Sequence, residues 1–192
     1  MSRIALILLL GLASLSAARA QDPDGPTLLA ANPSVSGPYQ GTVLLALPTG
    51  NGRHLGLILN RPTALRASAL FPELASGARL TAPLFFGGPY LPGSLFALVR
   101  SPYPPTEDAV EVLPELYLAQ GREDVAQVAG RLPARARFFV GVVVWQRGEL
   151  RSELDAGAWL VSDPDVELWT NGSVDTLWQR LLERVQTMLA AR

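Results

Sequence analysis

Few residues in this sequence are suited to chemistry, and the most suggestive ones stand where apolar segments end. Asn60 and Arg61 end one apolar segment, and Gly87 and Gly88 end another. If both segments are strands, these residues can lie together at one rim of a sheet. Glycine lets a ligand or another backbone approach closely, and arginine can bind an anion through two parallel hydrogen bonds. The sequence therefore predicts a ligand- or partner-binding site at this rim.

Trp145 ends a third apolar segment and completes the predicted site. An architectural interpretation stays open, because the Gly-Pro pair at 88–89 is turn chemistry and permits a tight chain reversal. In that case Asn60 and Arg61 bond to nearby backbone groups instead of a ligand. The expected partner is an unidentified protein or a small anionic ligand.

Histidine and cysteine chemistry is almost absent. The chain has one histidine and no cysteine, which removes thiol catalysis and cysteine-based metal sites. No G-x-S-x-G turn is present to supply an activated serine. The single histidine, His54, follows Asn51-Gly52, a strong hairpin signal, so we expect it to be exposed to solvent. We therefore expect no catalytic residue, no metal ligand and no cofactor.

Glu149 and Glu153 offer the best enzymatic alternative. They are four residues apart and share one face of a predicted helix, where paired carboxylates can bind a cation or transfer protons. A carboxylate-based hydrolase is therefore the second hypothesis. A solvated helix face beside Arg147 and Arg151 explains the same residues, so a non-enzymatic binding or regulatory module leads.

The N-terminus has the three parts of a secretory signal peptide. Residues 1–3 include a positive charge, 4–17 are apolar, and 18–20 end in a small-x-small pattern. We expect cleavage after Ala20, export to the periplasm or medium, and no transmembrane anchor in the mature chain. Residues 21–192 are expected to form a single domain. The formal net charge of −1 gives no electrostatic footprint for nucleic acid.

The remaining pattern predicts an α+β fold, because strands come in hairpins as well as beside helices. Residues 138–145 have the composition of a buried central strand, followed by a short helix from Glu149. Residues 42–47 and 55–60 should pair as a hairpin. The pattern also predicts strands at 84–86, 95–99, 110–112, 116–119 and 166–169, and helices at 64–74, 121–132 and behind Ser173.

Three blocks, taken in order, resemble the AlgH/YqgE family. They are the segments 56–62 and 85–89, and the set Gly141, Trp145, Gly148, Leu150, Glu153, Leu154, Trp159 and Leu160. The resemblance implies a single α+β domain whose bifurcated sheet folds toward a flattened pseudo-barrel. The family is linked by name to the regulation of alginate production and has no established enzyme activity. With its signal peptide, this chain resembles an exported, cysteine-free member acting in the cell envelope.

Overall fold

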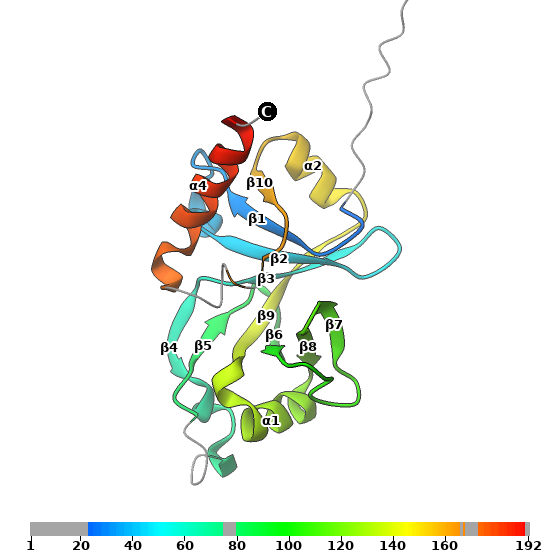
Figure 1. The fold of residues 1–192 in the computed structure, drawn as a ribbon, viewed down its shortest axis with the longest axis vertical. Coiled ribbons are helices and arrows are strands. Elements are labelled where there is room, and N and C mark those ends of the chain that lie inside the picture. The colour runs from blue at the N-terminus through cyan, green and yellow to red at the C-terminus, as the bar shows by residue number, and fades with distance from the viewer. Residues whose placement is uncertain (1–22, 75–79, 166, 168–172, 191–192) are drawn as a thin grey trace, which may run out of the picture.

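The computed structural model describes residues 23–74, 80–165, 167 and 173–190 (Figure 1). The predicted signal peptide, 1–20, lies outside these residues. So does the predicted strand at 166–169, apart from Glu167.

Within the described residues, ten strands form one sheet in the order β10-β1-β2-β3-β9-β6-β8-β7, with β4 and β5 beside this path. The bounds are β1 Thr27–Ala31, β2 Val43–Pro48, β3 His54–Ile58, β4 Pro62–Arg66, β5 Pro83–Phe86, β6 Tyr90–Arg100, β7 Val110–Leu113, β8 Leu116–Gln120, β9 Ala136–Trp145 and β10 Trp159–Ser162. All recorded pairs are antiparallel except β5 with β9. The sheet curls into a half-barrel, and the predicted α+β class is confirmed.

Strand β9 joins two groups of strands (Figure 1). Its last residues, 143–145, pair with β3 of an upper group that also contains β1, β2 and β10. Residues 138–140 pair with β5, and β6 lies along the other side, in a lower group that contains β4 to β8. The predicted central strand at 138–145 is therefore confirmed. Its β-branched and aromatic residues suit a strand with neighbours on both sides.

Three longer helices cover the sheet in the described part of the chain: α1 Arg122–Arg131, α2 Glu149–Asp155 and α4 Leu177–Ala190. Short 3-10 turns occur at Gly37–Tyr39, Ala67–Ala69, Pro72–Leu74, Pro133–Arg135 and Val174–Thr176. Helix α1 packs under the lower group against β6 and β8, and α4 packs on β1 and β10 of the upper group. None of the described helices has the length and apolar character needed to cross a membrane.

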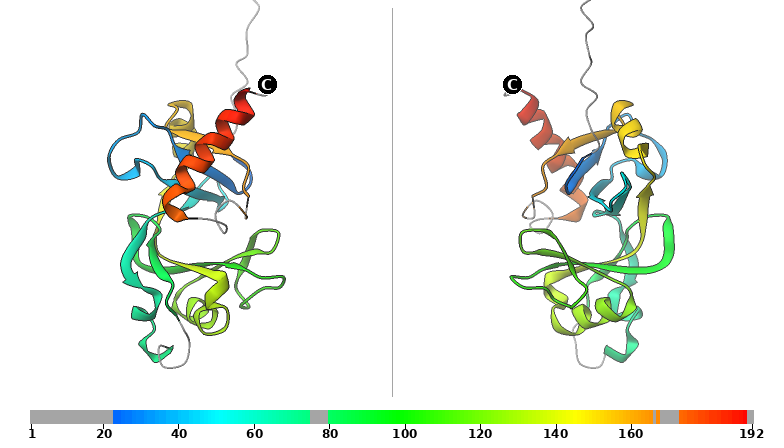
Figure 2. Two further views of the ribbon diagram at one scale, coloured as in Figure 1. Left: turned by 60° about the vertical axis from the view of Figure 1, so that its left-hand side comes forward. Right: turned by 90° about the vertical axis from the view of Figure 1, so that its right-hand side faces the viewer.

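Helix α4 lies diagonally across the upper group (Figure 2). The predicted cap is confirmed, because the Ser173 hydroxyl accepts the backbone N–H of Asp175. Leu177 and Leu181 are buried in the core, and the indole of Trp178 donates to the carbonyl of Ala31 at 2.8 Å. The predicted packing of this apolar stripe on the sheet is thus confirmed.

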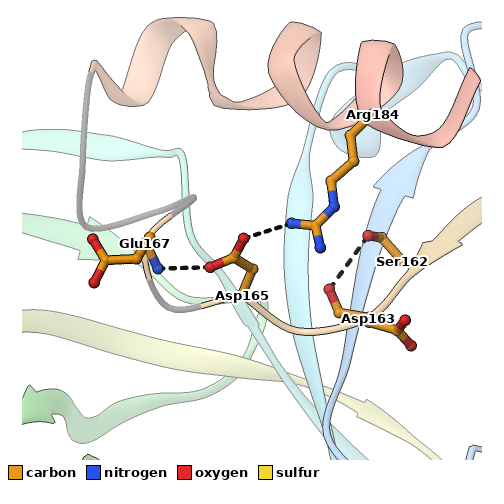
Figure 3. A network of polar contacts seen from close by, with 5 residues as sticks. All are labelled: Ser162, Asp163, Asp165, Glu167 and Arg184. Carbon is orange, nitrogen blue, oxygen red and sulfur yellow. Dashed lines mark hydrogen bonds and ion pairs between the residues drawn. The ribbon is translucent and has the colours of Figure 1, made fainter. Parts of the chain in front are cut away.

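A polar network fastens α4 to the segment that follows β10 (Figure 3). Arg184 donates to the carboxylate of Asp165 at 2.7 Å, and the other carboxylate oxygen accepts the backbone N–H of Glu167 at 2.9 Å. The helix is therefore held from its polar side as well as its apolar side.

The predicted helix at 64–74 is wrong. Pro62–Arg66 form β4, which pairs with β5, and two 3-10 turns follow. Pro72 cannot donate an intrahelical hydrogen bond and its ring obstructs the preceding turn, so one continuous helix cannot run through it. Before Pro72, pairing with β5 makes Pro62–Arg66 a strand.

Candidate functional site

Asn60 fastens the end of β3 to the start of β2. Its Oδ1 accepts the backbone N–H of Val43 at 2.9 Å, and its Nδ2 donates to the carbonyl of Gly41 at 2.9 Å. Val43 is fully buried, so its N–H would otherwise have no access to water. The Asn60 side chain therefore satisfies backbone groups of β2 and of the loop before it.

Arg61 holds the loop in front of β2. Its Nη2 donates to the carbonyl of Gln40 at 2.8 Å and to that of Pro38 at 3.3 Å. The backbone carbonyl of Arg61 accepts the N–H of Phe86 at 2.8 Å, which ties the same residue to the end of β5. The side chain is half-buried. These are the contacts that the architectural interpretation predicts.

Gly87 and Gly88 lie where the chain crosses β9 at Gly141. A Cβ on Gly87 would stand 2.2 Å from the carbonyl oxygen of Gly141, and one on Gly88 would stand 2.1 Å from the carbonyl carbon of Val142. Gly141 has φ +71° and its own Cβ would lie 2.3 Å from the Gly88 oxygen. Backbone atoms occupy these positions, so only glycine permits this crossing.

The first four predicted site residues therefore do meet at one strand junction, and their contacts there are with the backbone. Trp145 lies elsewhere, because it pairs with His54 at the opposite end of β3 from Asn60. Ligand binding by Asn60, Arg61, Gly87 and Gly88 stays a prediction.

Trp145 lines a hollow of about 430 Å³ between β9, α2 and the loop that contains the 3-10 turn at 37–39. We call it the aromatic hollow. Aliphatic residues fill part of its wall, and its aromatic and charged lining residues are Tyr39, Tyr90, Trp145, Trp159, Glu149 and Glu153. The sequence singled out Trp145 and the two carboxylates, but not the two tyrosines. Tyr39 ends a 3-10 turn and Tyr90 begins β6, and neither belongs to a periodic pattern.

Glu153 organises the two indoles of the hollow. Its Oε2 accepts the indole N–H of Trp145 at 2.8 Å and that of Trp159 at 2.6 Å. The two rings meet edge to face, with centroids 6.5 Å apart and an interplanar angle of 86°. Both tryptophans are almost fully buried, at 2% and 7% exposure. One oxygen of a half-buried carboxylate thus holds both rings in place.

Glu149 is held at the start of α2, where its carboxylate accepts the backbone N–H of Gln146 at 2.7 Å. Gly148 precedes the helix in the left-handed region, with φ +80°, so the chain turns sharply from β9 into α2. This turn brings Glu149 and Glu153 to the rim and the wall of the same hollow.

Tyr39 closes one side of the hollow against Trp159. The ring centroids are 5.9 Å apart at an interplanar angle of 79°. Burial raises the pKa of the Tyr39 hydroxyl, and the charge of Glu153 and the nearby Tyr90 raise it further. The pKa rises because each of these factors disfavours the charged tyrosinate form.

Nothing in these contacts supports the carboxylate-based hydrolase. Glu153 is bonded to two indoles and Glu149 to a backbone N–H, and within the described part of the chain no activated nucleophile stands beside them. The described residues also contain no group of three or more metal-binding side chains.

The prediction that His54 is exposed is wrong. Its side chain is 2% exposed, and its Nε2 lies 3.0 Å from the carbonyl oxygen of Pro23. His54 begins β3 just after the hairpin turn, and the segment leading into β1 covers it. The residues of the turn alone do not reveal that the segment before β1 packs over His54.

A second hollow, of about 470 Å³, has arginines on its wall: Arg100, Arg135 and Arg137. Arg100 is paired with Glu167 at 2.7 Å. Burial lowers the pKa of Arg137 to about 10, with a further contribution from the charge of Arg180. Arg137 also donates to the carbonyl of Leu59 at 3.2 Å and lies over the ring of Phe85. Arg100 and Arg137 are thus engaged by other parts of the chain.

These features define an α+β domain whose half-barrel sheet is organised by one shared strand and a glycine crossing. The profile of the family described as AlgH-like matches residues 28–190. The chain belongs to the AlgH-like family.

Relatives of this chain include two UPF0301 proteins from Bordetella. The protein from Bordetella avium is 33% identical over 159 residues, which cover 79% of this chain and 80% of the relative. The protein from Bordetella petrii is 31% identical over 156 residues, covering 79% and 77%.

Solved structures share the fold. The solution structure of the AlgH protein from Pseudomonas aeruginosa matches with a TM-score of 0.68 and 22% identity, over 90% of this chain and 97% of that one. A crystal structure of a protein from Corynebacterium diphtheriae matches with a TM-score of 0.67 and 21% identity, over 86% and 89%.

Proposed function

We propose that this protein is a binding or regulatory module of the cell envelope and that the aromatic hollow is its binding site. The observation that carries the proposal is the hollow itself, about 430 Å³ in volume, with Trp145 and Trp159 fixed by one carboxylate. Ligand sites are commonly concavities of this size, with aromatic walls and a few fixed polar groups.

The arrangement of the hollow is that of a rigid site. Both indoles are buried and bonded, so they need no reordering when a ligand arrives. Tyr90, by contrast, is 54% exposed at the rim and is available to a partner. Rigid walls with one accessible aromatic side chain favour binding over structural support alone.

Binding is tested by capture with the purified protein from a periplasmic extract, followed by identification of retained proteins and small molecules by mass spectrometry. Tyr90→Ala should abolish retention of the specific partner, and Tyr103→Ala should not. Tyr103 is a matched control because it is 75% exposed and lies outside the hollow. Equal capture by both variants and the unchanged protein contradicts the assignment of the site.

Action in the envelope rests on the signal-like segment 1–20. Expression of the full chain with a C-terminal tag in a Gram-negative host, followed by fractionation and intact mass measurement, tests it. We expect periplasmic protein beginning at Gln21. Full-length protein in the cytoplasm contradicts the envelope assignment without affecting the binding site.

A further inference from the structure

We infer that the aromatic hollow takes an organic cation, an ammonium or guanidinium group with apolar substituents. This inference rests on the proposed binding function and names the ligand class of the same site. It differs from the anionic ligand expected at Arg61, which concerns another part of the molecule.

The charge of the wall favours a cation. The described lining residues include Glu149 and Glu153 and no arginine. The two bonds that Glu153 accepts come from neutral indole N–H groups, so its negative charge is not cancelled. Both of these bonds end on Oε2. An anion entering the hollow would meet two carboxylates at short range in a partly desolvated site.

The aromatic side chains favour the same class. Four of them line the hollow: Tyr39, Tyr90, Trp145 and Trp159. The face of an aromatic ring carries partial negative charge and attracts cations. Because Trp145 and Trp159 are almost fully buried, Tyr39 and Tyr90 offer most of the accessible ring surface. Because the indole N–H groups are directed to Glu153, they are occupied and do not serve as donors to an anion.

The environment of Tyr39 is consistent with a negative potential at this place. Burial raises the pKa of its hydroxyl, and the charge of Glu153 raises it further. A bound cation would offset the influence of Glu153. The geometry of the hollow and the signs of its lining charges thus agree.

The apolar residues in the wall select among cations. Val35, Val143, Val144 and Ala158 line the hollow together with the rings and the carboxylates. A small inorganic ion cannot use this surface, whereas methyl or methylene groups around a charged nitrogen can. The same chemistry is offered by a free quaternary amine and by the side chain of arginine or lysine in a partner protein.

The test is a titration of the ¹⁵N-labelled protein with choline, followed through the indole N–H resonances of Trp145 and Trp159. The uncharged isostere 3,3-dimethylbutan-1-ol is the matched ligand control. We expect saturable shifts of both indoles with choline and a dissociation constant at least tenfold higher for the alcohol. N-acetyl-arginine amide forms a second arm, and preference for it over choline assigns the site to a protein side chain.

Glu153→Gln is the informative variant, because an amide oxygen can still accept the indole bonds while the charge is removed. It should raise the choline dissociation constant at least tenfold. Glu183→Gln, an exposed position on α4 outside the hollow, should leave it unchanged. Tyr90→Ala, a rim substitution that spares the core, should also weaken choline binding.

Equal binding of the alcohol and choline overturns the cation assignment and leaves the binding function standing. Absence of any indole shift with either cation overturns the cation inference, and the extract capture then decides the binding function separately. Unchanged choline affinity in Glu153→Gln likewise overturns the inference, provided that its indole spectrum remains folded.

Discussion

At the scale of single residues, substitution of Arg61 separates a structural role from a role in ligand binding. Its guanidinium bonds two backbone carbonyls of the loop before β2. Hydrogen bonds from a charged donor contribute more than neutral ones, although partial exposure reduces the effect. Arg61→Ala is expected to lower the free energy of unfolding by about 1–2 kcal/mol, measured by urea denaturation.

Arg131→Ala is the control for Arg61, because Arg131 is an exposed arginine in the last turn of α1. It should change stability by less than about 0.5 kcal/mol. A loss equally small for Arg61→Ala, together with weaker partner binding, would return this arginine to the ligand-binding role.

Gly87 tests the backbone crossing. An alanine Cβ there would overlap the carbonyl oxygen of Gly141, and neither backbone segment can move without breaking strand pairing. Gly87→Ala should destabilise the protein by about 3 kcal/mol or prevent folding, the upper range of overpacking. Gly93→Ala, where a Cβ meets nothing within 4 Å, should be nearly neutral. Equal thermal midpoints for the two variants would refute the steric explanation.

The Tyr39 hydroxyl gives a prediction for pH. Its pKa is raised in the folded protein by burial, Glu153 and Tyr90, so the neutral phenol is favoured by folding. The stabilisation is fully present below about pH 10, the pKa of an unfolded-state tyrosine, and is lost as pH rises through the folded-state value. In a spectrophotometric titration, the difference between wild type and Tyr39→Phe should show a tyrosine that ionises above about pH 10.

At the scale of elements, α4 depends on its anchor to β1. Trp178 packs against the core and donates to the Ala31 carbonyl. Trp178→Ala should lower the free energy of unfolding by about 3 kcal/mol, near the lower end for a tryptophan because the ring is half-buried. Gln179→Ala, on the exposed side of the same helix, should change it by less than about 0.5 kcal/mol. A loss under about 1 kcal/mol for Trp178→Ala contradicts the packing.

Elements with strong local signals were predictable, and those decided by distant partners were not. The hairpin of β2 and β3 follows from its Asn-Gly turn, and α4 follows from its cap and apolar stripe. Residues 64–66 were predicted to begin a helix but belong to β4, because β5 supplies a partner strand. No local pattern reveals such a partner.

The same distinction applies to the site. The sequence predicts Trp145 as part of the rim site, and Glu149 with Glu153 as a separate carboxylate pair, but it does not bring these three residues together. Tyr39 reaches the hollow from a loop more than a hundred residues earlier in the chain, and no spacing rule connects them. The backbone role of Asn60 likewise depends on Val43 and Gly41, which lie on the neighbouring strand and the loop before it.

At the scale of the whole molecule, the shared strand β9 makes the two groups one unit. It pairs with β3 above and with β5 and β6 below. The glycine crossing at Gly141 lies between the residues of β9 that pair with β5 and those that pair with β3, where the register with β6 shifts. Loss of either group removes partners from the same strand, which is a physical reason for cooperative unfolding.

The position of β1 has a consequence for biosynthesis. β1 lies between β2 and β10, and Leu28 pairs with Ser162. At ribosomal rates, β10 emerges on the order of ten seconds after β1. During that interval one edge of an apolar strand is unpaired, and such an edge invites association with other chains. Until β10 arrives, this edge of β1 therefore stays open to pairing with other chains.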